Sequence, residues 1–254
     1  MTRPKTQVIM TFIHAGGAGK TSTTRDIGAE LARRGHRVLL VDLDPQANLS
    51  DWLGAGGVPV EQTVVPVLED GAPLPEPQQV HGMDLIPSHL RLAKTEVMLP
   101  ALHNSEGRLK KALDRVREAG TYDFILLDAP PSLGKITGNG ANAADWLIIP
   151  LPASRKGLDA LAGVGEAIEA YSDTNEDLRV AMYLVTQAGH TTTSREVQDV
   201  YAQMFPGRLA GPISHRPGVY GDCQVEEQPV GPRQKEAHAE IAAAVDTLLE
   251  RVSA

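Results

Sequence analysis

The chain has 254 residues, a formal net charge of −8 and one cysteine, Cys223. This length is enough to bury a sizeable core, and we expect a single domain over residues 1–254. The negative charge argues against a surface that binds nucleic acid over its whole extent, so any DNA contact must be local or made by a dimer. One cysteine excludes an internal disulfide, and neither it nor the scattered histidines have the spacing of a structural zinc site.

The sequence contains no secretory segment and no apolar run of about 18 residues, which favours a cytoplasmic protein without a membrane span. Met1 to Lys5 is short and polar, so we expect no membrane anchor there. The run 236–252 is amphipathic but not basic, and it predicts a helix that caps the fold and does not bind a membrane.

A glycine-rich segment lies between an expected strand and an expected helix. Residues 8–13 are apolar and β-branched, and residues 21–34 have apolar side chains spaced for one helix face that ends at Gly35. In this context the glycines can turn the backbone so that consecutive N–H groups and the helix N-terminus face an anion, most naturally a nucleotide phosphate. The expected phosphate-binding residues are Gly16, Gly17, Ala18, Gly19, Lys20, Thr21 and Ser22.

Two side chains of this segment have expected chemical roles. Lys20 would reach the β- and γ-phosphates as a point charge, and the hydroxyl of Thr21 would bind Mg²⁺. The alternative is a glycine-rich turn whose lysine faces solvent.

The strict phosphate-loop pattern G-x-x-x-x-G-K-[ST] is broken, because its first glycine falls on His14. The segment resembles the deviant loop of the ParA/MinD ATPases, K-G-G-x-G-K-[ST], which here runs from Ala15 to Thr21. In this pattern the signature lysine of the family is replaced by Ala15.

A second strand, expected over residues 37–42, is apolar enough to be buried on both faces of a parallel sheet and ends in the sequence DLDPQAN. Its two carboxylates, Asp42 and Asp44, belong at the edge of the sheet where open α/β folds bind ligands, although either one alone can also cap a helix or lie in a polar loop. The stretch resembles the D-x-D-P-Q segment of ParA proteins. The resemblance implies that Asp44 orients the attacking water and that Asp42 lies nearer Lys20 and the metal.

The middle of the chain carries little visible chemistry. Residues 54–87 predict loops around a short helix at 64–68, followed by a short buried strand at 83–87. Two helices are expected over 91–102 and 106–119, and the alternating charges of the second indicate a solvated face.

Residues 122–128 read YDFILLD, an apolar strand that ends in an acid. Such an acid can hold Mg²⁺ through water, although a structural aspartate before a double-proline turn is the alternative. The strand end resembles the D-x-P-P-S-L-G segment of the ParA family. The expected metal site therefore combines Asp128 with Thr21 and Asp42.

The next strand, expected over residues 145–151, precedes two basic residues, Arg155 and Lys156. In ParA-like proteins this segment faces the partner subunit, and some carboxysome-positioning relatives that lack the signature lysine recruit a later one. We expect Arg155 or Lys156 to supply the missing cation in trans, since charge neutralisation is central to phosphoryl transfer. Two solvated basic residues at a helix start are the alternative.

A further strand over residues 179–186 leads to a helix through Gln203 that begins near the sequence SREV. The family resemblance implies that Arg195 belongs to a surface for non-specific DNA, whose binding would fall with salt. An ion pair on a helix surface is the alternative. Arg216 is a second DNA candidate, in the segment 213–220, which matches the family poorly. Family members often contact the adenine from this segment and from the residues after Thr186, so the mismatch leaves the adenine contacts open.

Few aromatic residues, 4% of the chain, favour helices packed on a parallel sheet. We expect a three-layer, doubly wound α/β fold with a mostly parallel sheet. The resemblance implies a weak ATPase that uses ATP/ADP and Mg²⁺, forms an ATP-dependent homodimer, and binds non-specific DNA on the nucleoid. A ParB-like partner would stimulate hydrolysis in chromosome or plasmid segregation. The alternatives are a ParA-like ATPase that positions a protein cargo, and a nucleotide-binding regulatory module with little hydrolysis.

Overall fold

One mixed sheet organises the protein, whose computed structural model describes residues 5–252. Residues 1–4, which belong to the N-terminal segment considered for a membrane anchor, lie outside the described residues. The strand order is β3-β4-β2-β5-β1-β6-β7-β8, and every neighbouring pair is parallel except β3 with β4. The strands are β1 (Gln7–Thr11), β2 (Val38–Asp42), β3 (Gln78–Val80), β4 (Met83–Ile86), β5 (Phe124–Asp128), β6 (Trp146–Pro152), β7 (Arg179–Thr186) and β8 (Leu209–Ala210).

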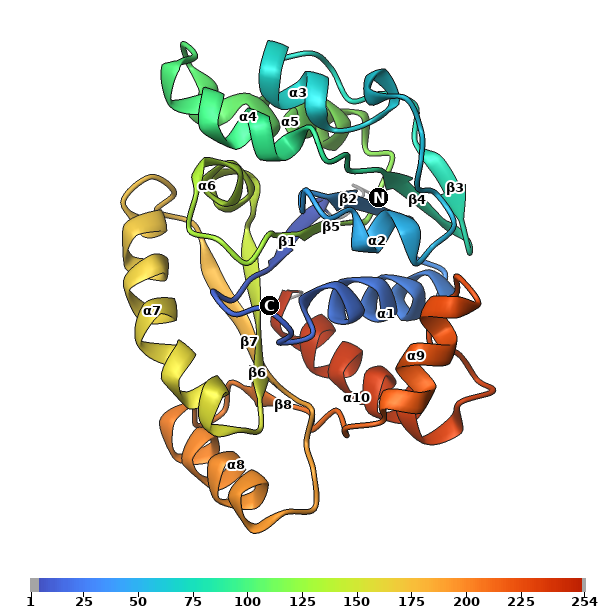
Figure 1. Cartoon of the computed structure of the whole chain (residues 1–254), viewed down its shortest axis with the longest axis vertical. Coiled ribbons are helices and arrows are strands. Elements are labelled where there is room, and N and C mark those ends of the chain that lie inside the picture. Colours follow the sequence, from blue (N-terminus) through green and yellow to red (C-terminus); the bar gives the residue numbers. More distant parts are fainter. Residues whose placement is uncertain (1–4, 253–254) are drawn as a thin grey trace.

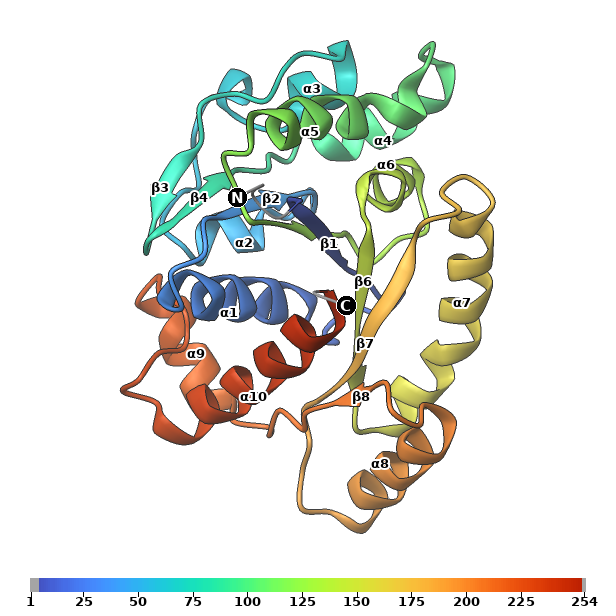
Figure 2. The same cartoon turned by 180° about the vertical axis from the view of Figure 1, so that it is seen from behind.

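Helices cover both faces of this sheet, which gives three layers (Figures 1 and 2). One face carries α3 (Val65–Asp70), α4 (Leu92–Met98), α5 (Arg108–Ala119), α6 (Lys135–Ala143), α7 (Arg155–Ser172) and α8 (Thr192–Met204). The other carries α1 (Lys20–Arg33), α2 (Asn48–Asp51), α9 (Pro217–Val225) and α10 (Lys235–Val252). Three short 3₁₀ turns complete the described elements: η1 (Val60–Gln62), η2 (Leu99–Ala101) and η3 (Ser105–Gly107).

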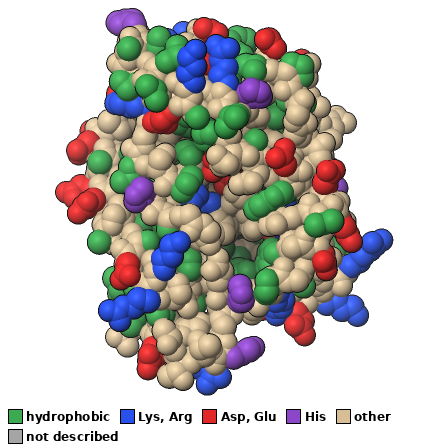
Figure 3. Space-filling view, viewed as in Figure 1, with side chains coloured by type: hydrophobic (Ala, Val, Ile, Leu, Met, Phe, Trp, Pro, Cys, Tyr) green, Lys and Arg blue, Asp and Glu red, His purple; other side chains and the backbone are tan. Residues whose placement is uncertain are grey.

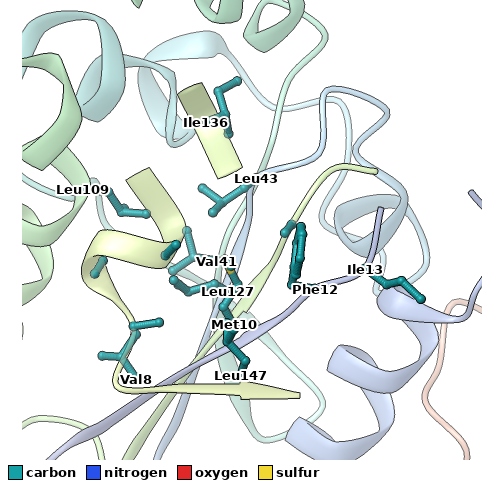
Figure 4. Packing of buried hydrophobic residues seen from close by; sticks show 14 of the residues in the cluster. Val8, Met10, Phe12, Ile13, Val41, Leu43, Leu109, Leu127, Ile136 and Leu147 are labelled. Atoms are coloured by element: carbon teal, nitrogen blue, oxygen red, sulfur yellow. The ribbon is translucent and has the colours of Figure 1, made fainter. Parts of the chain in front are cut away.

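The core lies in two apolar layers, one on each face of the sheet. Side chains of successive strand residues alternate between these layers, so Met10, Val41 and Leu127 pack towards α5 and α6 (Figure 4). Their chain neighbours, such as Leu40 and Leu126, pack towards α1 and α10. Because the central strands are buried on both faces, their sequences are continuously apolar, as in other parallel sheets.

The doubly wound, mostly parallel α/β fold expected from the sequence is confirmed. Several boundaries differ. The strand expected over 8–13 ends at Thr11, and the helix expected over 91–102 ends at Met98 and continues as a 3₁₀ turn, because Pro100 has no N–H for the α-helical pattern. The sequence analysis did not identify β3, which has three residues, or the short helix α2.

The predicted capping helix is α10, which packs against α1 and is joined to it by the ion pair between Arg34 and Asp246, 2.6 Å apart. Within residues 5–252, no helix has the length and apolarity required to cross a membrane.

Candidate functional site

The glycine-rich loop connects β1 to α1 beside the carboxyl ends of the central strands (Figure 1). Gly17 and Gly19 have φ angles of +72° and +91°, a region that side chains with a Cβ rarely adopt. A Cβ on Gly16 or Gly17 would meet no atom within 4 Å, so the loop is open on that side. The loop therefore has the turn and the free space that a phosphate group requires.

The backbone donors of this loop are free. Among residues 5–252, no acceptor is recorded for the N–H groups of residues 16–22, which include the first turn of α1. Clustered N–H groups at a helix N-terminus form an anion site, because their dipoles add to that of the helix.

Lys20 is folded back along this loop. Its ammonium donates to the carbonyl oxygens of Ala15, at 3.0 Å, and Ile13, at 3.3 Å, and its side chain is buried. Burial lowers the pKa of Lys20, and the charges of Asp128 and Asp44 oppose this shift without cancelling it. The lysine thus lies at the loop with its charge close to the acids at the end of the sheet.

Asp42 and Asp128 end β2 and β5 and are paired in the register of these strands. Both are fully buried. Burial raises the pKa of Asp42 to about 7, although hydrogen bonds from Ser50 and the Asp44 backbone favour the charged form. Burial and the charge of Asp42 raise the pKa of Asp128 to about 8, against the opposing effect of the Thr21 hydroxyl and Lys20.

These contacts distinguish the two acids. Asp42 accepts hydrogen bonds from the Ser50 hydroxyl at 2.7 Å and from the backbone N–H groups of Ser50 and Asp44. Asp128 accepts one from the Thr24 hydroxyl at 3.3 Å through Oδ1, whereas its buried Oδ2 has no hydrogen-bond partner. An orphaned buried carboxylate oxygen is costly unless a cation binds it, so Asp128 has the free ligand atom of this pair.

The donor set fits Mg²⁺, which prefers oxygen ligands and keeps several waters when bound through one or two carboxylates and substrate phosphates. The Thr21 hydroxyl and the free Oδ2 of Asp128 are oxygen groups of this kind, and Asp42 is the register partner of Asp128. Within the described part of the chain, no group of three or more His, Cys, Asp or Glu could hold a metal alone. A cation here would therefore depend on phosphate oxygens as well.

Asp44 lies two residues beyond the end of β2 and is nearly buried, 7% exposed. Its carboxylate accepts the N–H of Gln46 at 2.9 Å, and its carbonyl accepts the Ser88 hydroxyl at 2.5 Å. These two hydrogen bonds hold Asp44 on its turn. Its charge is close enough to Lys20 to oppose the lowering of the lysine pKa by burial.

A pocket of about 180 Å³ adjoins the loop on the side of α10. The surface is hollowed on the face drawn in Figure 3, where basic and acidic side chains are interspersed. The pocket combines polar groups of the strand ends with apolar groups of α1 and α10, a mixture typical of small-molecule sites. Its lining residues are Gly19, Ser22, Thr23, Asp26, Ile27, Leu184, Thr186, Gln187, Ile213, Ser214, His215, Arg216, Pro217, Tyr220, Ile241 and Ala244.

The sequence analysis left the base-binding residues open, and it pointed only to the segment 213–220 and the residues after Thr186. Both segments line the pocket. The contributions of α1 and α10, such as Ile27 and Ile241, carried no sequence signal beyond their apolar character.

The four basic candidates have different surroundings. Arg155 and Lys156 begin α7 and are exposed, and the Lys156 ammonium donates to the Gly16 carbonyl of its own chain at 3.1 Å. Arg195 is exposed on α8. The Arg216 guanidinium is paired with Glu240 at 2.6 Å and with Glu236 at 3.2 Å.

A parallel sheet with a glycine-rich loop, a lysine and two carboxylates at its carboxyl edge defines a protein of the phosphate-loop nucleotide-binding class. The sequence profile of the AAA domain family matches residues 6–180. The chain is 41% identical to the probable plasmid-partitioning protein ParA of Thermus thermophilus, over 96% of this chain and 78% of that protein. It therefore belongs to the ParA/MinD-type ATPases of this family.

Another relative is similar in sequence, and solved structures share the fold. The sporulation initiation inhibitor protein Soj of Bacillus subtilis is 38% identical over 67% of this chain and 68% of that protein. A cobyrinic acid a,c-diamide synthase structure from Mycobacterium smegmatis with bound ADP and magnesium has a TM-score of 0.81 at 31% identity, covering 98% of this chain and 96% of that chain. Apo McdA from Cyanothece, at 22% identity, shares the fold with a TM-score of 0.85 over 96% of this chain and 99% of that chain.

Proposed function

We propose that this protein is a ParA-type partition ATPase, built as one phosphate-loop domain over residues 1–254. It uses ATP·Mg²⁺ to form a homodimer that binds non-specific DNA and hydrolyses ATP slowly to ADP and phosphate. The observation that carries the proposal is the loop at residues 16–22, whose N–H groups have no recorded acceptor in the described part of the chain and which lies beside the orphaned oxygen of Asp128.

The residues have the following roles. Residues 16–22 bind the phosphate chain, Lys20 neutralises charge on the β- and γ-phosphates, and Asp44 orients the attacking water as the general base. Thr21 and Asp128 hold Mg²⁺, with Asp42 beside them. The bound cation supplies neutralisation of the phosphate charge that grows during transfer.

Low turnover is expected because Asp44 fully positions the attacking water only in the stimulated dimer. In the free protein Oδ1 of Asp44 accepts the N–H of Gln46, which leaves Oδ2 to orient a water. We propose that a ParB-like partner stimulates hydrolysis by completing this arrangement in the dimer, and that hydrolysis then releases the protein from DNA and the nucleoid.

The loop has Ala15 where related loops carry a lysine, so a cation from the partner subunit would complete the charge balance. Both residues are exposed, and Arg155 is the better candidate for this contact in trans because Lys156 already donates to the carbonyl of Gly16 in its own chain. Both remain to be tested by replacement with alanine, and unchanged ATP-dependent dimerisation in both variants would refute this part of the proposal.

DNA binding is proposed for the exposed face of α8 that carries Arg195. Because the net charge is −8, this contact has to be local, and two copies of it in a dimer would add their phosphate contacts.

Sedimentation velocity tests the proposal as a whole. The protein is run with ADP·Mg²⁺ and with ATP·Mg²⁺, with and without duplex DNA of random sequence, at 50 and 200 mM salt, with Lys20→Ala as the control that cannot neutralise the phosphates. We expect a dimer only with ATP, bound to DNA at the lower salt, and a monomer for Lys20→Ala. A monomer under all conditions that still binds nucleotide would favour a regulatory module, and an ATP dimer that ignores DNA would favour a protein cargo.

A further inference from the structure

Three successive carbonyl groups of the phosphate loop accept hydrogen bonds from side chains that are distant in the sequence. The Lys156 ammonium donates to the Gly16 oxygen at 3.1 Å, and the Gln187 amide donates to the Gly17 oxygen at 2.5 Å. The Thr186 hydroxyl donates to the Ala18 oxygen at 3.0 Å. These donors lie 140, 170 and 168 residues from their acceptors, so the loop is shaped by contacts with the far half of the chain.

Because each peptide unit is planar, a hydrogen bond that fixes a carbonyl also fixes the direction of the N–H of the next residue. In a trans peptide the C=O of one residue and the N–H of the next point in opposite directions. The donor on the Gly16 carbonyl therefore makes the Gly17 N–H point away from Lys156. In the same way, the donors on the Gly17 and Ala18 carbonyls orient the N–H groups of Ala18 and Gly19. None of these N–H groups has a recorded acceptor within residues 5–252. The three carbonyl groups on the back of the loop are thus hydrogen-bonded, and the N–H groups on its opposite side are free to bind a ligand.

The outer donors are themselves fixed. Lys156 is the second residue of α7, whose first turn is capped by Ser154 and begins against β6 because Gly157 has no Cβ. Thr186 is the last residue of β7 and is 5% exposed, and a Cβ on Gly19 would lie 3.9 Å from its side chain. The backbones of Lys156 and Thr186 are therefore positioned by α7 and β7 and not by the loop.

We propose that Lys156, Thr186 and Gln187 are positioning residues that preset the phosphate loop for the phosphate chain of a nucleotide. They act on the loop through its backbone; Lys156 touches only its back, whereas Thr186 and Gln187 also line the adjoining pocket. Lys156 adds a charge-assisted bond, which polarises the peptide between Gly16 and Gly17 and strengthens its N–H as a donor. The inference rests on the proposed nucleotide site and deepens it, and it assigns Lys156 a role within its own protomer.

The test separates binding of phosphates from binding of the base. Lys156→Met and Thr186→Val keep the size of each side chain and remove its donor, while Lys156→Arg and Thr186→Ser keep a donor. Isothermal titration with ADP·Mg²⁺ and with adenosine is combined with the Tm of each free variant. Lys135→Met serves as the control, because Lys135 is a half-exposed lysine whose recorded side-chain partner is Glu106.

Loss of one such bond is expected to weaken ADP·Mg²⁺ binding about five- to tenfold, with recovery in the arginine and serine variants. Adenosine affinity should be unchanged in Lys156→Met, because Lys156 lies outside the pocket lining, which includes Thr186. Lys135→Met is expected to bind as the wild type does. Wild-type ADP·Mg²⁺ affinity in both Lys156→Met and Thr186→Val would overturn the inference and leave the nucleotide site intact, as would an equal loss for adenosine in Lys156→Met. A wild-type protein that binds no ADP·Mg²⁺ would overturn the proposed function, and the inference with it.

Discussion

Asp42 and Asp128 are register partners at the ends of the parallel strands β2 and β5, and both carboxylates are fully buried. Burial raises the pKa of both acids, to about 7 for Asp42 and about 8 for Asp128, and their mutual repulsion contributes to the shift at Asp128. A pair of this kind costs folding free energy unless a cation lies beside it. The buried acids therefore lower the free energy of unfolding of the free protein, and a bound cation would restore it.

Replacing Asp128 by asparagine should therefore stabilise the free protein and remove its response to the cation. We expect the Tm of Asp128→Asn in chelator at pH 8 to rise by about 2–4 °C, corresponding to about 1 kcal/mol. The wild type should gain more from ATP·Mg²⁺ than from ATP with chelator, and the variant should show no such difference. Scanning calorimetry measures both effects, with the exposed Asp177→Asn as control. A fall in the Tm of the free Asp128→Asn variant would contradict this account.

Gly157 lets α7 begin directly against the end of β6. A Cβ at this position would lie 2.1 Å from the Pro152 carbonyl and 2.6 Å from the Tyr201 hydroxyl. Gly157→Ala should therefore destabilise the protein by about 2 kcal/mol, because both neighbours are held in place. Gly163→Ala in the same helix is the matched control, since its Cβ meets nothing within 4 Å, and it should stabilise by about 0.5–1 kcal/mol. Urea unfolding of the two variants gives both values, and equal midpoints would refute the packing argument.

The parts of the fold that follow from neighbouring residues could be predicted from the sequence. The apolar strands ending in Asp42 and Asp128 predicted a parallel sheet, and parallel strands bring their carboxyl ends to one edge. The loop before Lys20 could be recognised because its glycines, lysine and flanking elements are contiguous. The fold class was confirmed for this reason, whereas the roles of the individual site residues remain predictions.

The rest depends on contacts between distant residues. No local pattern could show that Thr186 and Gln187 would reach the loop from 168 and 170 residues away, or that α10 would line the pocket beside the loop. The same limit applies to Arg216, whose partners lie 20 and 24 residues further on, in α10. The strand β3 was missed because three residues are too few to establish a period of two.

Glu30 on α1 is the centre of a charge cluster that joins α1 to α10. Burial alone would raise its pKa, but hydrogen bonds from Arg34, Arg33 and His238 outweigh burial and lower the pKa. A carboxyl whose pKa is lowered on folding stabilises the protein above its unfolded pKa of about 4.3 and loses this effect as the pH falls through the folded value. Glu30→Gln should therefore lower the Tm at pH 7, and the difference from the wild type should shrink below about pH 4.

Thermal melts of both proteins between pH 3 and pH 8 check this prediction. The exposed Glu166→Gln on α7 is the control and should leave the whole profile unchanged. A Tm difference for Glu30→Gln that stays constant over the acid range would mean that the cluster acts through packing and not through charge.

Arg195 and Arg216 were both expected to contact DNA, but their surroundings favour this role for Arg195 and not for Arg216. Arg195 is exposed on α8, whereas Arg216 bonds to Glu240 and Glu236 of α10, which raises its pKa and ties the segment 213–217 to that helix. The negative charges of these two acids offset the positive charge of Arg216 locally, so the arginine attracts a DNA phosphate only weakly. We therefore expect Arg195→Ala to weaken binding of the ATP-bound protein to random duplex DNA about five- to tenfold at 50 mM salt and to reduce the salt dependence by about one phosphate contact.

For Arg216→Ala we expect the opposite pattern. Its Tm should fall, and its nucleotide affinity should decrease because the pocket wall loses its attachment to α10, while the salt dependence of DNA binding stays at the wild-type slope. Fluorescence anisotropy at four salt concentrations gives the slopes, and Arg208→Ala provides an exposed basic control. A reduced slope for Arg216→Ala with an unchanged one for Arg195→Ala would place the DNA surface beside α10, because only a residue that contacts phosphate alters the number of counterions released.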